Sequence, residues 1–234
     1  EQRKQLGGML RYGIPNYRLP RKKLDDEIAS ILSTGIEVRK NVSVGVDVTI
    51  EELHKEYDAM YISIGAHADK KMGIEGEDAK EGVTSAVEML RVIGDDEMPD
   101  YTGKKVVVVG GGSVGLDVIE YFAPRGAECT IIDMLPQIGM LADPITKCSM
   151  RETHDKYGVK EYVNTALQEV KENAFTVKLP DGTIQDLEFD YGFNCLGMRS
   201  NNPVLPQIEE AFKDTDTYVY TIGDSVRARR IMEG

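Results

Sequence analysis

The clearest hydrophobic pattern in the chain is a run of four valines, Val106–Val109, that leads directly into glycine. Continuous β-branched residues are typical of a strand buried on both faces, as in a parallel sheet. Helical spacing follows over about 113–122, and Pro124 and Gly126 predict where this helix ends. The next apolar segment predicts a second strand that ends at Asp133. We therefore expect an α/β domain with a parallel sheet and a glycine-rich turn at its carboxyl edge.

The glycine-rich turn carries Gly110, Gly112 and Gly115 in the spacing G-x-G-x-x-G. In this pattern the first glycine allows the tight turn, the second allows a pyrophosphate to approach, and the third allows the helix to pack on its strand. The helix N-terminus also offers unpaired N–H groups to a phosphate. Asp133 follows about 20 residues later, at the usual position of an acid that binds a ribose 2′-hydroxyl. The alternative is a glycine-rich turn that binds nothing.

The pattern thus predicts a dinucleotide site, and its acid bears on the choice of cofactor. A carboxylate at the ribose repels a 2′-phosphate, and residues 134–137 supply no arginine to neutralise one. NAD(H) is therefore favoured over NADP(H). The predicted site consists of Gly110, Gly111, Gly112, Ser113, Val114, Gly115 and Asp133.

Two segments of the chain follow the same order of elements, which indicates an internal duplication. A helical pattern over 24–34 leads into a strand-like segment, 35–44, and a helical pattern over 145–157 leads into 158–167. Each unit then closes on a short predicted strand with a final glycine. These closing segments are 57–66 and 189–198, and the second is preceded by a predicted hairpin over 175–189 with a Pro-Asp-Gly turn.

The duplication leaves one element without a counterpart. In the second unit the glycine-rich loop begins 48 residues before Gly158, but only 34 residues precede Gly35. The interpretation we favour is that the chain is a fragment of a longer protein whose first unit also had a nucleotide loop. The alternative is a first unit that never had one.

Composition and charge narrow the classes of partner. The formal net charge of −12 argues against nucleic acid and anionic membrane surfaces. Cys129, Cys148 and Cys195 are far apart and form neither CxxC nor a metal-ligand spacing, so we expect reduced thiols, no metal and a cytoplasmic location. The three histidines are equally scattered, and we predict no catalytic side chain among them.

Several motifs together resemble the pyridine nucleotide-disulfide oxidoreductase superfamily of flavoproteins. Residues 6–20 and 35–53 resemble the flavin domain of the glutamate synthase small subunit, and 73–91 resemble the crossover of those proteins into their NAD domain. Residues 131–139 and 221–234 look more like the flavin/NAD module of 2-enoate and 2,4-dienoyl-CoA reductases. The resemblance covers nearly the whole chain, and its motifs identify the superfamily better than the subfamily.

The resemblance implies further cofactor contacts, position by position. Gly7, Gly8 and Arg11 match a loop that lies along the FAD, and Val44 matches a position at the adenine. Ser63, Ile64 and Gly65 match the family's Ala-Thr-Gly motif near the FAD diphosphate, with Ser-Ile in place of Ala-Thr. The remaining matches are the ribityl-binding pair Gly223 and Asp224, and Gly197 beside the nicotinamide dinucleotide.

The family architecture implies a Rossmann-like NAD-binding domain inserted into an FAD-binding domain. We expect the NAD-binding domain at 103–198 and an incomplete FAD-binding domain at 1–102 and 199–234, with exposed core surface or an open sheet edge. The resemblance implies FAD in the intact parent. Because the first G-x-G-x-x-G and its acid are absent, FAD binding by this chain stays open.

The implied activity is an NADH-dependent flavoprotein oxidoreductase module. It would pass hydride from NADH to FAD and electrons on to an acceptor domain, subunit or substrate outside these residues. No redox-active CxxC is present, which argues against dithiol chemistry within the chain. The alternatives are a non-catalytic NAD(H)-binding or electron-routing subunit, and a catalytically silent structural domain.

Overall fold

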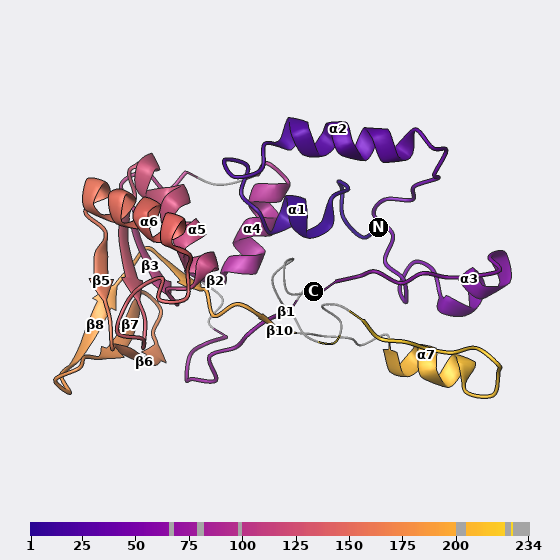
Figure 1. The fold of residues 1–234 in the computed structure, drawn as a ribbon. Coiled ribbons are helices and arrows are strands. Elements are labelled where there is room, and N and C mark those ends of the chain that lie inside the picture. The colour runs from indigo at the N-terminus through magenta and orange to yellow at the C-terminus, as the bar shows by residue number, and fades with distance from the viewer. Residues whose placement is uncertain (66–67, 79–81, 98–99, 200–204, 223–225, 227–234) are drawn as a thin grey trace. The chain divides into compact units, whose positions relative to one another are not determined.

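The computed structural model describes residues 1–65, 68–78, 82–97, 100–199, 205–222 and 226. The chain divides into two compact units (Figure 1). Unit 1 comprises residues 1–68, 93–96 and 198–234, and unit 2 comprises 69–92 and 97–197. The predicted domain boundaries stay a prediction, and each unit is described by itself.

Unit 2 is built on a five-stranded sheet in the order β2-β9-β3-β4-β5, with every neighbouring pair parallel. Its strands are β2 (Val83–Ser85), β3 (Lys105–Val109), β4 (Glu128–Ile132), β5 (Lys160–Tyr162) and β9 (Tyr191–Asn194). Its helices are α4 (Ala86–Gly94), of which the last two residues belong to unit 1, α5 (Ser113–Phe122), the short 3-10 turn η1 (Ala123–Arg125) and α6 (Pro144–Tyr157). The predicted α/β fold with a parallel sheet is confirmed.

A second, antiparallel sheet in unit 2 contains β6 (Ala166–Val170), β7 (Ala174–Lys178) and β8 (Ile184–Glu188). The sequence predicts the β7–β8 hairpin, and the structure confirms it with residue-by-residue pairing from Ala174–Glu188 to Lys178–Ile184. Apolar side chains fill the space between this sheet and one face of the parallel sheet. The buried members of this core are Val107, Val109, Ile132, Val170, Phe175, Val177 and Phe189.

The opposite face of the parallel sheet is covered by helix α5. Val106 and Val108 alternate along β3 with the two valines of the first core, and they are completely buried on this side. Val118 and Ile119 of the helix are completely buried as well. The valine run is therefore buried on both faces, as its composition predicts. Phe122 at the end of α5 stacks with Tyr101 at a centroid distance of 4.8 Å. Burial raises the pKa of Tyr101.

Unit 1 contains the helices α1 (Gly8–Tyr12), α2 (Arg21–Leu32), α3 (Ile50–Glu56) and α7 (Leu205–Phe212). Helix α3 begins at a capping box in which Thr49 and Glu52 satisfy each other's backbone N–H groups. The Tyr12 hydroxyl donates a hydrogen bond to Asp95 at 3.0 Å. Among the described residues of this unit, the buried apolar side chains are those of Tyr12, Leu24, Ile50 and Ile93. Two short strands, β1 (Ala68–Asp69) and β10 (Met198–Arg199), pair where the chain passes between the units.

Two strand predictions in unit 1 are wrong for the described residues. Segments 35–44 and 57–65 contain no strand in the structure, whereas the helix of the same repeat is confirmed as α2. Val44 makes only an isolated bridge to Val48, which closes a turn. A β-branched or aromatic segment becomes a strand only where a neighbouring backbone pairs with it, and the amino-acid pattern cannot supply that neighbour.

The difference in burial predicts that chymotrypsin cleaves unit 1 first. Tyr61 and Tyr218 are each 83% exposed in extended segments, whereas Tyr191 in β9 stacks on Tyr101 at 3.9 Å. Limited digestion followed by mass spectrometry should release a core fragment containing 69–197, with cleavage after Tyr61 or Tyr218 at least about tenfold faster than after Tyr191, because cleavage needs a locally opened chain. Equal rates would contradict the two-unit description.

Candidate dinucleotide site

The register of the parallel sheet brings three strand ends together. Val109 of β3 pairs with Ile132 of β4 on one side and with Asn194 of β9 on the other. The residues that follow these strands, Gly110, Asp133 and Cys195, therefore emerge side by side at the carboxyl edge. The chain runs from β3 through α5 to β4 on one side, while β9 lies on the other. Ligands of open α/β sheets bind at such a reversal of strand order.

Backbone hydrogen bonds fix the ends of the strands. Gly110 N–H donates to the carbonyl of Ile132 at 2.9 Å, and Cys195 N–H donates to the carbonyl of Val109 at 2.8 Å. Gly110 has a positive φ of 106°, and a Cβ atom here would lie 2.8 Å from the Cys195 carbonyl oxygen. This glycine is therefore required both by its conformation and by its neighbour.

The other two glycines of the motif differ in what surrounds them. A Cβ on Gly115 would lie 1.9 Å from the carbonyl oxygen of Gly110, so the helix can cross this close to the turn only with glycine there. A Cβ on Gly112 would meet no protein atom within 4 Å, and its φ of −79° suits any residue. The protein itself therefore gives no reason for glycine at 112, and open space at this backbone fits an approaching phosphate.

The first turn of α5 presents its N–H groups beside this open space. Gly112 is the N-cap of the helix and, being glycine, it provides no side-chain capping hydrogen bond. Gly112 and Ser113 are exposed, Val114 is half-buried and Gly115 is buried. Uncapped N–H groups at the positive end of a ten-residue helix favour an anion, so the predicted loop residues have the geometry of a phosphate cradle.

Asp133 lies at the end of β4 and contacts the loop directly. Its Oδ2 accepts a hydrogen bond from Gly111 N–H at 2.6 Å, and its Oδ1 accepts one from Leu135 N–H at 2.8 Å. A carboxylate has about four lone-pair positions, so both oxygens retain acceptor capacity for ribose hydroxyls. The sequence predicts that Asp133 binds the ribose, and the structure adds its hydrogen bond to the loop.

Sequence reasoning missed two residues that contact the loop, Ile138 and Gly139. Ile138 is fully buried and lies against Gly111, while Gly139 N–H donates to the Gly111 carbonyl at 2.8 Å. The available signal was a glycine in the loop after the acid, which has a positive φ of 64° in the structure. Gly197, a predicted contact, lies two residues beyond Cys195 with a φ of 86°, and its carbonyl accepts Lys70 N–H at 2.9 Å.

The two cysteines of unit 2's core do not have the chemistry of redox thiols. Burial raises the pKa of Cys129 to about 12, and burial with a smaller effect of Asp117 raises the pKa of Cys195 still further above its ordinary value. Raised pKa values keep these groups as unreactive thiols. Among the described residues no cluster of His, Cys, Asp or Glu could hold a metal ion.

The predicted flavin contacts in unit 1 lie in separate places. Gly7 is the N-cap of α1, with Gly8 beside it, and both have positive φ. The guanidinium of the buried Arg11 binds Asp25 and donates from Nε to the carbonyl of Leu6 at 2.7 Å. Val44 is exposed next to its turn. Gly223 and Asp224 lie outside the described residues, and the flavin contacts stay a prediction.

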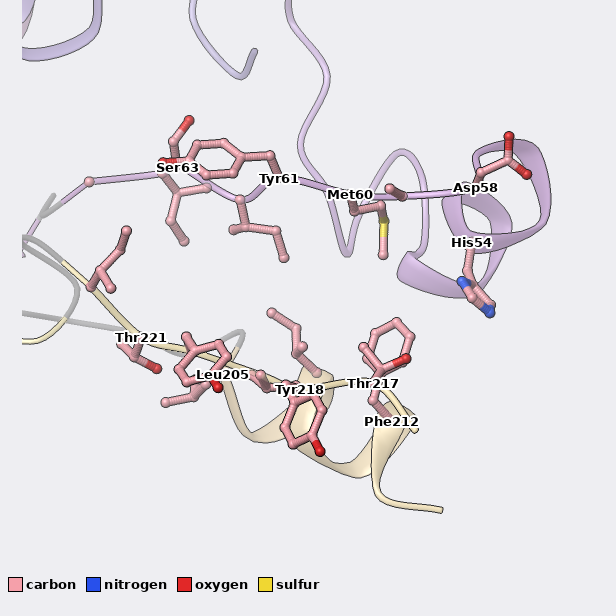
Figure 2. A pocket seen from close by; sticks show the side chains of 18 residues that line it. His54, Asp58, Met60, Tyr61, Ser63, Leu205, Phe212, Thr217, Tyr218 and Thr221 are labelled. Atoms are coloured by element: carbon pink, nitrogen blue, oxygen red, sulfur yellow. The ribbon is translucent and has the colours of Figure 1, made fainter. Parts of the chain in front are cut away.

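Ile64 and Gly65 instead line an apolar groove of about 730 Å³ within unit 1. Figure 2 shows Tyr61 and Ser63 on one side of it and Tyr218 and Thr221 on the other. The ring of His54 meets that of Phe212 edge-on at 5.4 Å. Ten further residues of 58–65 and 205–222, most of them apolar, complete the lining. Several of these side chains are largely exposed, so unit 1 presents apolar surface to its surroundings.

A family model described as "Pyridine nucleotide-disulphide oxidoreductase" matches residues 6–233. The chain belongs to this family. The predicted family is confirmed. None of the described helices combines the length and apolarity that crossing a membrane would need.

Curated relatives and a solved structure agree with this assignment. The chain is 46% identical over 123 residues to the NADP(+)-dependent formate dehydrogenase subunit beta of Moorella thermoacetica, covering 52% of this chain and 17% of that protein. It is 37% identical over 139 residues to the glutamate synthase [NADPH] small chain of Mycobacterium tuberculosis, covering 54% and 28%. A 2-naphthoyl-CoA reductase complex shares the fold, with a TM-score of 0.79 at 22% identity over 98% of this chain and 33% of that one. The chain thus spans a third or less of each of these proteins.

The difference in space around Gly112 and Gly115 predicts that alanine affects ligand binding at the first position and stability at the second. Gly112→Ala should leave the melting temperature within about 2 °C of the unsubstituted chain but weaken dinucleotide binding at least about tenfold, because the added methyl occupies the approach to the backbone. Gly115→Ala should lower the melting temperature by several degrees, because it overpacks the turn. Calorimetric unfolding and ligand titration distinguish them, and unchanged affinity in Gly112→Ala would refute the phosphate site.

Proposed function

We propose that this chain is the nicotinamide-dinucleotide-binding part of a flavoprotein oxidoreductase and that it uses NADH. The observation that carries the proposal is the juxtaposition of an uncapped helix N-terminus, an open backbone at Gly112 and the carboxylate of Asp133 at one sheet edge. Family membership supports the pairing with a flavin.

The residues of unit 2 would bind and orient the dinucleotide. The N–H groups at the start of α5 receive the pyrophosphate, the glycines keep side chains out of its path, and Asp133 accepts from the ribose hydroxyls. When bound, the nicotinamide supplies a hydride for a flavin, which is chemistry that belongs to the cofactors. We assign no side chain as acid or base, because this transfer needs none.

The preference for NADH rests on charge. Within the described part of the chain, the two carboxylate oxygens of Asp133 accept from backbone N–H groups and pair with no cation. A carboxylate within about 4 Å of a 2′-phosphate costs roughly several kcal/mol at an effective dielectric constant of 20, before screening. Two of the relatives carry NADP(+) or NADPH in their names, which argues for NADPH rather than NADH. The preference of this chain therefore has to be measured.

We further propose that the chain works with additional polypeptide. The relatives are named as subunits or chains, and the matched segments cover only 17% and 28% of their lengths. Unit 1 also exposes apolar side chains around its groove. The flavin and the electron acceptor would be provided with that polypeptide. The alternative is a non-catalytic NAD(H)-binding or electron-routing subunit.

The charge argument predicts that the chain binds NADH at least about tenfold more tightly than NADPH, which corresponds to about 1.4 kcal/mol. Isothermal titration of the chain with each cofactor gives the ratio of dissociation constants. Asp133→Asn keeps one acceptor oxygen but removes the charge, so it should bring this ratio close to one. A chain that prefers NADPH, or a ratio unaffected by Asp133→Asn, would show that the cofactor assignment is wrong.

One spectrum separates the enzyme from the binding subunit. A native protein that contains this chain, is yellow and loses its flavin absorbance on addition of NADH supports the oxidoreductase. A protein that binds NADH without any flavin absorbance supports the binding subunit. A protein that binds neither nucleotide contradicts both.

A further inference from the structure

The peptide groups of Gly111 are held on both sides by the segment that follows β4. Gly111 N–H donates to Asp133 Oδ2 at 2.6 Å, and the Gly111 carbonyl accepts from Gly139 N–H at 2.8 Å. Asp133 and Gly139 both belong to the loop that connects β4 with α6. These two hydrogen bonds join the middle of the glycine-rich turn to a loop more than 20 residues away in the sequence. We call this pair of hydrogen bonds, from Gly111 to Asp133 and from Gly139 to Gly111, the clasp.

Ile138 holds this loop in place by packing. Its side chain is fully buried, and two of its carbon atoms would lie 3.1 and 3.2 Å from a Cβ on Gly111. Gly139 lies against Met150 of α6 and Leu116 of α5, both of which are buried. The hydrogen bond from Gly139 is therefore anchored in the packing between two helices.

The clasp has a directional consequence for the next N–H group. The carbonyl of Gly111 and the N–H of Gly112 belong to one planar trans peptide, in which these two groups point in opposite directions. Since the carbonyl points to Gly139, the N–H of Gly112 must point away from that loop. Gly112 is exposed, and open space surrounds the position of its missing side chain.

We infer that Ile138 and Gly139 are positioning residues that aim the Gly112 N–H at the bound dinucleotide's pyrophosphate. The inference rests on the proposed dinucleotide site and deepens it. The clasp acts on the phosphate-binding backbone, which NADH and NADPH share, and Asp133 joins this clasp to the ribose end of the site. Loss of Ile138 therefore weakens both cofactors by the same factor, whereas loss of the Asp133 charge changes their ratio.

The chain offers a matched pair of substitutions for the test. Ile138→Ala removes a fully buried side chain, and Ile145→Ala makes the same chemical change at a position that is 82% exposed in the first turn of α6. Ile138→Val keeps most of the packing, so it still tests the inference if the alanine variant unfolds. Dissociation constants for NADH and NADPH are measured by isothermal titration, well below each variant's melting temperature.

In Ile138→Ala we expect both dissociation constants to rise about tenfold with their ratio unchanged. Ile145→Ala should stay within a factor of two, and Ile138→Val should recover most of the affinity. A merely structural role would lower the melting temperature of Ile138→Ala and leave both constants unchanged, which would overturn the inference.

Amide hydrogen exchange, read residue by residue by NMR, tests the clasp without any cofactor. In Ile138→Ala the amides of Gly111 and Gly139 should exchange at least about tenfold faster than in the unsubstituted chain and in Ile145→Ala. Unchanged exchange would overturn the inference even if NADH binds. Faster exchange in a chain that binds no NADH would show instead that the clasp exists but that the proposed dinucleotide site has failed.

Discussion

The parallel pairing of β3 with strands on both of its sides is the interaction on which the candidate site depends. It holds Val109, Ile132 and Asn194 in register, so that the chain turns at Gly110, Asp133 and Cys195 along one edge. Burial of the valines on both faces makes a shift of this register costly, because a slip by one residue would exchange the side chains that face α5 with those that face the antiparallel sheet. The site is therefore as rigid as the core beneath it.

Backbone groups, rather than reactive side chains, carry the chemistry that this edge can perform. The buried cysteines have raised pKa values, and the groups presented at the turn are N–H donors and one carboxylate. Groups of this kind are suited to binding and orienting a polyanion, and none of them needs to transfer a proton to it. This agrees with an oxidoreductase family in which the cofactors perform the reaction and the protein supplies position and electrostatics.

The sequence was most informative where local pattern and burial agree. The valine run, the helix over 113–122 and the hairpin over 175–189 could be predicted, because each satisfies its own hydrogen bonds or lies inside unit 2's core. The segments 57–65 and 218–222 have equally good strand composition, but their state depends on a neighbouring backbone that composition cannot reveal. The contacts of Ile138 and Gly139 with Gly111 escaped prediction for a related reason, since they join loops distant in sequence.

The most direct test of the account is a crystal structure of the chain with ADP-ribose, which carries the pyrophosphate and the adenine ribose of the cofactor. The account predicts a pyrophosphate oxygen within about 3 Å of the Gly112 or Ser113 backbone nitrogen and a ribose hydroxyl within hydrogen-bond distance of Asp133. ADP-ribose bound elsewhere, with the turn at Gly110–Gly115 left empty, would contradict it.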